Sequence, residues 1–270
     1  MTIQDRAKAF AALHAGPRLL VLPNAWDAGS ARVIQHAGAS AIATSSAAVA
    51  WAHGYADGQF LPWETLLHTV SEIVKTVTVP VSADIEAAYA HDAATAAKTV
   101  GQVIEAGAVG INIEDGNDSP DLLAKKIENL REASRKQGVD IWVNARVDTY
   151  LRRLVEGEAA YGETVRRAKL YREAGASSIF VPAFPDNGRI AQLAKDVVLP
   201  LNLLAWPGLP DGSALEKAGV RRLSAGSGIG KAVLSETFKL AKDFLAHGAS
   251  EPLVQGPLTN PEINGMLRKG

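Results

Sequence analysis

Charged side chains stand in this sequence where short apolar runs end. Asp84 and Glu86 close one run, Glu114 closes the next, and Arg146 closes a third. Alternate residues of a β-strand point to the same face, so Asp84 and Glu86 are expected on one side of their strand. Three successive strands are therefore predicted to present charge at one end.

These charges do not balance by themselves. Asp84, Glu86 and Glu114 in one cleft, with Arg146 as the evident counter-charge, would repel one another unless a cation or bound protons offset the repulsion. A divalent ion is the simplest solution, and we predict a metal site on these three acids. Arg146 has a second interpretation, as a structural ion-pair partner of Glu114.

The overall composition and charge exclude several classes of function. The chain has 270 residues, of which 47% are hydrophobic and 21% charged, and its formal net charge is −1. No basic cluster marks a nucleic-acid surface, and no apolar stretch is long enough to cross a bilayer. The first residues suit a surface helix and lack the apolar core of a secretion signal, so we expect a cytoplasmic protein with a small-molecule ligand. The absence of cysteine excludes disulfides, thiolate zinc sites and a cysteine nucleophile.

Eight runs rich in Val, Ile, Leu and Ala recur along the chain, and helix-forming sequence follows each. The predicted strands are Leu19–Pro23, Ala41–Ser45, Val79–Asp84, Gly110–Glu114, Ile141–Arg146, Ser178–Pro182, Leu199–Leu204 and Arg221–Ala225. Eight such units predict a TIM (β/α)8 barrel. An open, doubly wound sheet also alternates strand and helix, but the count of eight and the lack of a glycine-rich fingerprint after the first strand argue against it.

Several helical segments end in a glycine that would cap the helix before the next strand, namely Gly38, Gly107, Gly175 and Gly219. The predicted helices are Trp63–Thr76, Ala93–Ala106, Asp121–Gln137, Gly162–Ala174, Arg189–Lys195, Ser213–Lys217 and Ser235–His247. A proline-containing tail follows from Glu251. We predict a single α/β domain over residues 1–270, with a helical extension over about 235–270 that a closed barrel does not need.

The strand ends of a barrel gather at one mouth, where further polar residues are expected. Ser45, Ser46 and Ala47 follow the second strand, Asp57 lies in the next loop, and Asn202 is on the seventh strand. Any one of these polar or acidic side chains could be a helix cap or an ion-pair partner. Helix capping gives no reason for acids to share a face on consecutive strands, so together they indicate a site.

The glycine-rich segment 223–230 follows the eighth strand and has two interpretations. Its backbone N–H groups could hold a phosphate, or its small residues could form a tight, closely packed turn. Both interpretations stay open.

Several of these motifs, taken in order, resemble the isocitrate lyase and phosphoenolpyruvate mutase superfamily. The resemblance runs from about Pro17 to about Lys231. It is carried by Leu22–Ala31, Ser45–Ser46, Gly54–Gly58, Ala83–Glu86, Asn112–Gly116 and Asn144–Asp148. It implies a modified barrel, in this family often with the eighth helix exchanged between neighbouring subunits, and a homodimer or homotetramer.

The resemblance also implies roles at the site. Asp84 matches the direct ligand of Mg²⁺, or of Mn²⁺ in its place. Three further carboxylates match those that hold the ion through its water shell: Asp57, Glu86 and Glu114. The substrate's acid group would be held by Ser45, Ser46, Ala47 and Arg146. Asn202 is added as a substrate-binding candidate, and the expected catalytic set is Arg146, Glu114 and Asp57.

One departure from the family pattern bears on the reaction. Isocitrate and methylisocitrate lyases carry a cysteine-containing loop after the fourth strand, where this chain has Gly116–Pro120 and no thiol. We therefore expect a magnesium-dependent carbon–carbon lyase or decarboxylase that acts on a small 2-oxo or 2-hydroxy dicarboxylic acid through a pyruvate-like enolate. Asp118 or Lys125 could supply a substitute acid. The alternatives are a phosphonomutase or phosphonopyruvate hydrolase and, from another class, a non-catalytic barrel that binds a metabolite.

Overall fold

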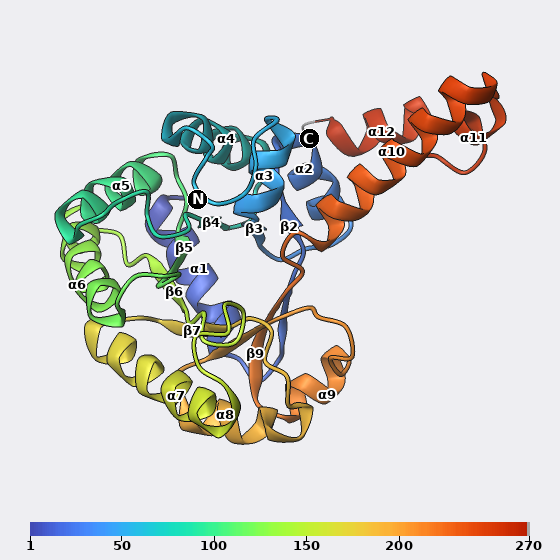
Figure 1. Cartoon of the computed structure of the whole chain (residues 1–270). Helices are drawn as coiled ribbons and strands as arrows, with labels where there is room; N and C mark the ends of the chain where they lie inside the picture. Colours follow the sequence, from blue (N-terminus) through green and yellow to red (C-terminus); the bar gives the residue numbers. More distant parts are fainter. Residues whose placement is uncertain (269–270) are drawn as a thin grey trace.

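A ring of parallel strands forms the centre of the computed structural model, which describes residues 1–268 (Figure 1). Nine strands pair in the order β1-β9-β8-β7-β6-β5-β4-β3-β2. Their bounds are β1 (Leu20–Leu22), β2 (Asn24–Ala25), β3 (Ile42–Thr44), β4 (Val81–Asp84), β5 (Gly110–Glu114), β6 (Trp142–Arg146), β7 (Ser178–Val181), β8 (Leu201–Leu204) and β9 (Val220–Ser224). Pro23, which has no backbone N–H, separates β1 from β2, and the two act as one position of the ring. The predicted TIM-type α/β barrel is confirmed.

Every predicted strand overlaps an observed one, and the register brings the charged ends together. Asp84 pairs with Asn112 on the neighbouring strand, and Glu114 pairs with Arg146. Parallel pairing through three consecutive strands therefore places these side chains side by side at the C-terminal edge of the ring.

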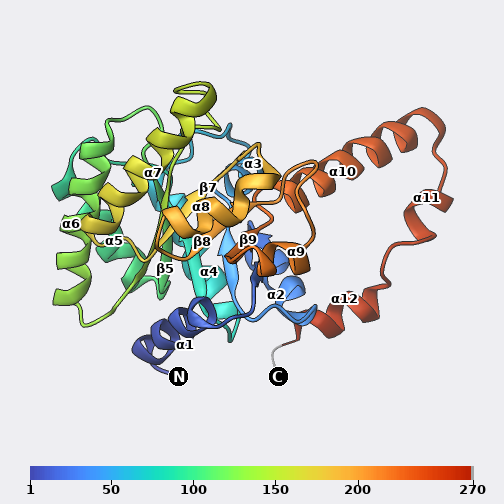
Figure 2. The same cartoon turned by 90° about the horizontal axis from the view of Figure 1, so that it is seen from below.

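Helices surround the ring and cover most of its outer face (Figures 1 and 2). They are α1 (Ile3–Ala15), α2 (Ala28–His36), α3 (Ser46–Ala52), α4 (Trp63–Thr76), α5 (Ala93–Glu105), α6 (Pro120–Lys136), α7 (Gly157–Ala174), η1 (Asn187–Arg189), α8 (Ile190–Asp196), α9 (Gly212–Lys217), α10 (Gly228–His247), α11 (Glu251–Val254) and α12 (Asn260–Leu267). The predicted glycine caps Gly38, Gly107, Gly175 and Gly219 all have positive φ, as a left-handed cap requires.

The last barrel helix begins earlier than predicted. α10 starts at Gly228 and not at Ser235, so residues 228–230 of the glycine-rich segment are helical. Glycine is a poor helix former, but a Cβ on Gly230 would lie 2.9 Å from Ala48 Cβ. The close approach of α10 to α3 explains the glycine at position 230, whereas a Cβ on Gly228 would meet no atom within 4 Å.

Helix α1 closes the N-terminal end of the barrel. Its outer face is solvated, as expected for a surface helix, but the ring of Phe10 is fully buried and that of His14 nearly so. His14 stacks on Trp142 with ring centroids 4.2 Å apart. Gly110 leaves space for the Phe10 ring of α1, because a Cβ at position 110 would lie 2.6 Å from Phe10 Cε1.

The C-terminal helices leave the barrel (Figures 1 and 2). α10 extends outward, the chain turns at α11, and α12 returns to α2, where Arg32 donates to the backbone oxygens of Met266 and Arg268. Apolar side chains on α10 are solvent-exposed, including Phe238 at 71% and Leu245 at 86%. Of the extension predicted over 235–270, residues 269 and 270 lie outside the described part of the chain. Within residues 1–268, none of the helices is both long and apolar enough to span a membrane.

Candidate active site

A cavity of about 430 Å³ opens at the C-terminal ends of the strands, a size suited to a small metabolite. Its charged lining residues are Asp57, Asp84, Arg146 and Lys231. The uncharged lining residues are Asn24, Ser45, Ser46, Ala47, Asn112, Leu151, Phe180, Pro182, Leu204, Ala205, Trp206, Pro207, Ser224, Ala225, Gly226, Ser227 and Gly228. The predicted mouth of the barrel is thus a polar chamber with one apolar wall.

Asp84 is held at the end of β4 by the neighbouring strand and helix. Its Oδ2 accepts hydrogen bonds from the backbone N–H and the hydroxyl of Ser46, at 3.2 and 3.0 Å. Its own backbone N–H donates to the Thr44 hydroxyl at 2.8 Å. Its other oxygen, Oδ1, accepts only a 3.4 Å contact from the Glu86 N–H. The carboxylate is therefore fixed in direction and keeps one oxygen largely free.

Glu86 lies beside Asp84 in a strained backbone conformation. Its φ is +50°, which non-glycine residues rarely adopt. Its Oε1 accepts from the Gln59 N–H at 3.2 Å and from the Tyr89 hydroxyl at 3.1 Å. Burial, together with the charges of Asp84 and Asp57, raises the pKa of Glu86 to about 7. Strain of this kind is commonly retained where it positions a functional side chain.

Arg146 forms ion pairs with two acidic residues, Glu114 and Asp148. Its Nε and Nη2 donate to the two carboxylate oxygens of Asp148 at 2.6 and 2.8 Å, and its Nη1 lies 2.5 Å from Glu114 Oε2. Burial alone would lower the pKa of Arg146, but Glu114 and Asp148 raise it above its ordinary value. The structural ion pair considered for Arg146 is therefore present. The same guanidinium also lines the cavity, so pairing does not exclude contact with a substrate.

The acids around Asp84 repel one another. Burial raises the pKa of Glu114, and the charges of Asp148, Asp84 and Glu86 add to that shift and outweigh Arg146. The pKa of Asp57 is also raised, by burial first and then by Asp84. A cation among these carboxylates would relieve the repulsion, and all-oxygen ligands suit a hard divalent ion. The residues present therefore fit magnesium.

The fit is to an ion that keeps most of its waters. Among residues 1–268, no three His, Asp or Glu side chains lie close enough together to ligate a single ion directly. Magnesium is commonly held by one or two carboxylates and several waters, as the expected roles of Asp84, Asp57, Glu86 and Glu114 require. These roles stay predictions.

The predicted substrate-binding residues divide into two groups. Ser45, Ser46 and Ala47 line the cavity, at the start of α3. The hydroxyl of Ser45 accepts the capping bond from Ala48 N–H, and Ser46 is engaged by Asp84, so Ala47 offers the uncommitted backbone N–H. Asn202 is fully buried beneath the cavity and accepts a hydrogen bond from Ser224 at 3.2 Å.

Arg146 is the one evident counter-charge in the sequence, but the structure adds two further cations near the acids, Arg152 and Arg222. Arg152 lies 3.9 Å from Glu114 and donates to Asp148 at 3.1 Å. Arg222 is fully buried inside the barrel, where it donates to Ser224 and Asn112. Burial lowers the pKa of Arg222 to about 10, against the opposing effect of Asp84. Its inward direction could have been inferred, because Arg222 and Ser224 are alternate residues of one strand.

The short loop after β5 is tied down and stays outside the cavity lining. Asp118 pairs with the buried Lys126 at 3.3 Å, and Lys126 also donates to the backbone oxygen of Ala87. Lys125 pairs with Glu128 on the exposed face of α6. Both residues considered as substitute acids therefore have other partners here.

Asp115, at the base of this loop, has a structural role. Its Oδ2 accepts from Arg167 and from the Tyr171 hydroxyl, at 2.8 and 2.6 Å. Its Oδ1 accepts the backbone N–H of Asp148 at 3.0 Å. Asp115 therefore fastens the loops after β5 and β6 to helix α7.

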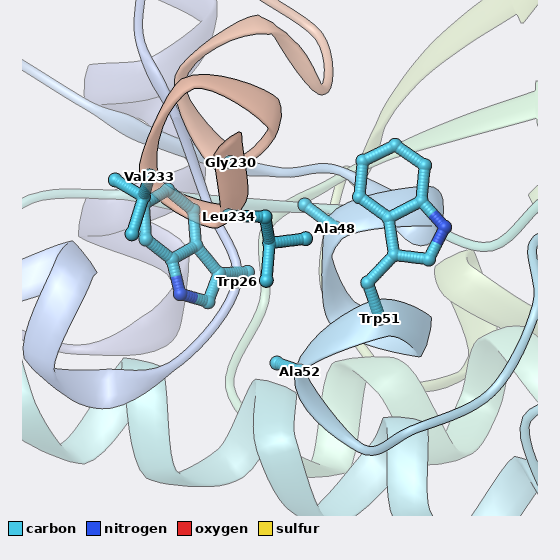
Figure 3. A pocket seen from close by; sticks show the side chains of 7 residues that line it. All are labelled: Trp26, Ala48, Trp51, Ala52, Gly230, Val233 and Leu234. Carbon is cyan, nitrogen blue, oxygen red and sulfur yellow. The ribbon is translucent and has the colours of Figure 1, made fainter. Parts of the chain in front are cut away.

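Packing explains two glycines of the glycine-rich segment, Gly226 and Gly230. Gly226 has a φ of +57°, donates its N–H to Asn24 Oδ1 at 2.8 Å, and leaves no room for a Cβ beside Leu204. Gly230 packs against Ala48 and Trp26 (Figure 3). The small pocket next to it, about 40 Å³, is lined almost wholly by apolar side chains of α3 and α10. The interpretation as a tight, closely packed turn accounts for both glycines.

Residues 10–245 match the phosphoenolpyruvate phosphomutase family. The chain belongs to this family. An uncharacterized protein from Mycobacterium tuberculosis is 35% identical over 223 residues, which cover 81% of this chain and 82% of that protein. A crystal structure of a candidate phosphonomutase from Burkholderia cenocepacia is 34% identical in sequence and superposes with a TM-score of 0.84. The match covers 88% of this chain and 99% of the phosphonomutase.

More distant relatives include enzymes with named reactions. Oxaloacetate decarboxylase 1 from Pseudomonas fluorescens is 26% identical over 87% of this chain and 83% of its own length. 2-Methylisocitrate lyase from Bacillus subtilis is 27% identical over 73% of this chain and 66% of its own length. A phosphonopyruvate hydrolase, solved with oxalate and Mg²⁺, has the same fold at 23% identity, with a TM-score of 0.84 and coverage of 97% and 94%. Family members are thus lyases, decarboxylases, mutases and hydrolases of small organic acids.

Proposed function

We propose that this protein is a magnesium-dependent carbon–carbon lyase or decarboxylase for a small 2-oxo or 2-hydroxy dicarboxylic acid. The observation that carries the proposal is the composition of the cavity. Asp84, Asp57 and Arg146 line it, whereas no cysteine, histidine or tyrosine does so. The site is thus equipped to bind an acid and a cation, and among residues 1–268 its lining offers no thiol, imidazole or phenol to protonate a carbanion on one face; its one ammonium group is that of Lys231.

Different residues would bind the metal and the substrate. Asp84, oriented by Ser46, would hold Mg²⁺ or Mn²⁺, with Asp57, Glu86 and Glu114 around its water shell. When bound, the metal would supply Lewis-acid stabilisation for negative charge on the 2-oxo oxygen. Arg146, fixed by Asp148, and the free N–H of Ala47 would keep the neighbouring carboxylate in register.

The product enolate would take its proton from solvent. The loop at Gly116–Pro120 does not line the cavity, and Asp118 is paired with Lys126. Oxaloacetate suits such a site, because its enolate needs no proton on a defined face. Relatedness to oxaloacetate decarboxylase 1 of Pseudomonas fluorescens supports this substrate class. The proposal includes a cytoplasmic homodimer or homotetramer of one barrel domain per chain.

A side-by-side assay with Mg²⁺ tests the proposal. Pyruvate release is measured from oxaloacetate, 2-methylisocitrate and phosphonopyruvate, with Asp84→Asn at the same metal concentration as the control for spontaneous decarboxylation. We expect oxaloacetate to be the best of the three and the variant to lose about 100-fold or more, as when a group that stabilises developing charge is removed. Preferred turnover of 2-methylisocitrate would contradict the proposal, and preferred turnover of phosphonopyruvate would favour P–C bond chemistry instead.

A further inference from the structure

One cation in the cavity has no acidic partner. Arg146 is neutralised by Glu114 and Asp148 before any substrate enters. Lys231 lines the same cavity, and its side chain takes part in no ion pair or hydrogen bond within residues 1–268. An unpaired ammonium group beside a chamber that takes an organic acid is a binding group for a negative charge.

Lys231 and Arg146 lie on different sides of the mouth. Lys231 is in the first turn of α10, which follows β9, and Arg146 ends β6. Two strands, β7 and β8, separate β9 from β6 in the ring. The two cations therefore reach the cavity from nearly opposite positions of an eight-membered ring, and one bound molecule with charge at both ends could meet both.

The base of Lys231 is rigid. Its neighbour Gly230 packs on Ala48 and Trp26, and a Cβ at Gly230 would be only 2.9 Å from Ala48 Cβ (Figure 3). This contact fixes the first turn of α10 against α3. A lysine on a fixed turn loses only its own side-chain freedom when it binds a ligand.

We propose that Lys231 binds the second acid group of a dianionic substrate, the one remote from the metal and Arg146. This inference rests on the proposed function. A carboxylate taken into the cavity without a partner would be strongly unfavourable, and Lys231 is the unpaired cation available for it. Ser227, whose hydroxyl makes no capping bond at the start of α10, lines the cavity on the same side. The structure therefore favours dicarboxylic acids over monoacids as substrates.

Two inhibitors separate the ends of the site. Oxalate would bind at the metal end of the site and has no remote acid group, whereas 3,3-difluorooxaloacetate carries one. Their dissociation constants are measured by calorimetry with Mg²⁺ for the wild type, Lys231→Met, Lys231→Arg and the control Lys242→Met. Lys242 is on the same helix, about three turns further along, and does not line the cavity.

We expect Lys231→Met to weaken difluorooxaloacetate about tenfold or more and to leave oxalate within about twofold. Lys231→Arg should retain most of the affinity, and Lys242→Met should match the wild type. If Lys231→Met weakens neither inhibitor or both equally, Lys231 does not bind the remote acid group and the inference is wrong. If the wild type fails to bind oxalate with Mg²⁺, the proposed function fails and this inference fails with it.

Discussion

At the scale of single residues, the site is an excess of acids held in fixed directions. Ser46 fixes Asp84, Tyr89 and the Gln59 N–H fix Glu86, and Arg146 pairs with Glu114. Each contact orients a carboxylate without fully neutralising the group of acids. Burial first, and then repulsion from neighbouring carboxylates, raises the pKa values of Glu86, Glu114 and Asp57, and a bound cation would offset that repulsion.

The raised pKa of Glu86 predicts a pH dependence of stability in the metal-free protein. Its ordinary value is 4.5, and burial with two neighbouring acids raises it to about 7. Between these values the folded state binds more protons than the unfolded state, so the free energy of unfolding falls as pH rises from about 5 to about 7.5. Denaturation in a chelator at a series of pH values measures this slope.

Glu86→Gln should make that slope shallower, because glutamine does not titrate, while Glu114 and Asp57, whose pKa values are also raised, keep contributing to it. The exposed Glu105→Gln variant is the matched control and should keep the wild-type slope. A Glu86→Gln protein with the full wild-type slope would show that Glu86 does not titrate in this range.

At the scale of elements, the barrel depends on a helix at each end. The first turn of α10 packs on α3 at the mouth, and α1 closes the opposite end. Gly110 allows the Phe10 ring to enter between the strands, and Gly230 allows two helices to touch. Glycine is needed at both positions because a side chain would overlap a neighbour.

Helix α1 therefore contributes core stability and not only surface area. Phe10 is fully buried, and Phe10→Ala should lower the free energy of unfolding by about 3–5 kcal/mol, the usual cost of removing a buried aromatic ring. Chemical denaturation measures the loss, and the exposed Lys8→Ala on the same helix should change stability by less than about 0.5 kcal/mol. Equal free energies of unfolding for the two variants would mean that the buried Phe10 ring does not stabilise the barrel.

At the scale of the whole molecule, part of the outer surface of the barrel, at β1, is not covered by a helix. Val21, in the middle of β1, is 54% exposed, although strands of a parallel barrel are normally covered by helices. The helix that follows the eighth strand position, α10, extends away and exposes Phe238 and Leu245 (Figure 2). A second copy could cover both surfaces, as the predicted exchange of this helix requires.

Assembly through α10 should therefore be sensitive to charge on its apolar face. We expect Phe238→Asp and Leu245→Asp to shift the wild-type oligomer toward monomer, because either change would bury an unpaired carboxylate in the interface. Size-exclusion chromatography with light scattering measures the shift. Lys239→Asp, at a neighbouring exposed position, is the control for added negative charge. A monomeric wild type would contradict the predicted assembly.

The sequence by itself determined the barrel and the placement of charged residues at its strand ends. Strand periodicity and glycine caps located eight units, and side-chain alternation placed Asp84 and Glu86 on one face, because these features depend on local geometry. Only the tertiary structure decided which charges meet. Arg152 reaches Glu114 from a loop, and Arg222 reaches Asn112 from another strand. Asp118 pairs with Lys126, and Gly230 packs on a distant helix in the first turn of α10. Contacts between segments far apart in the chain depend on how helices and strands pack, which local patterns do not record.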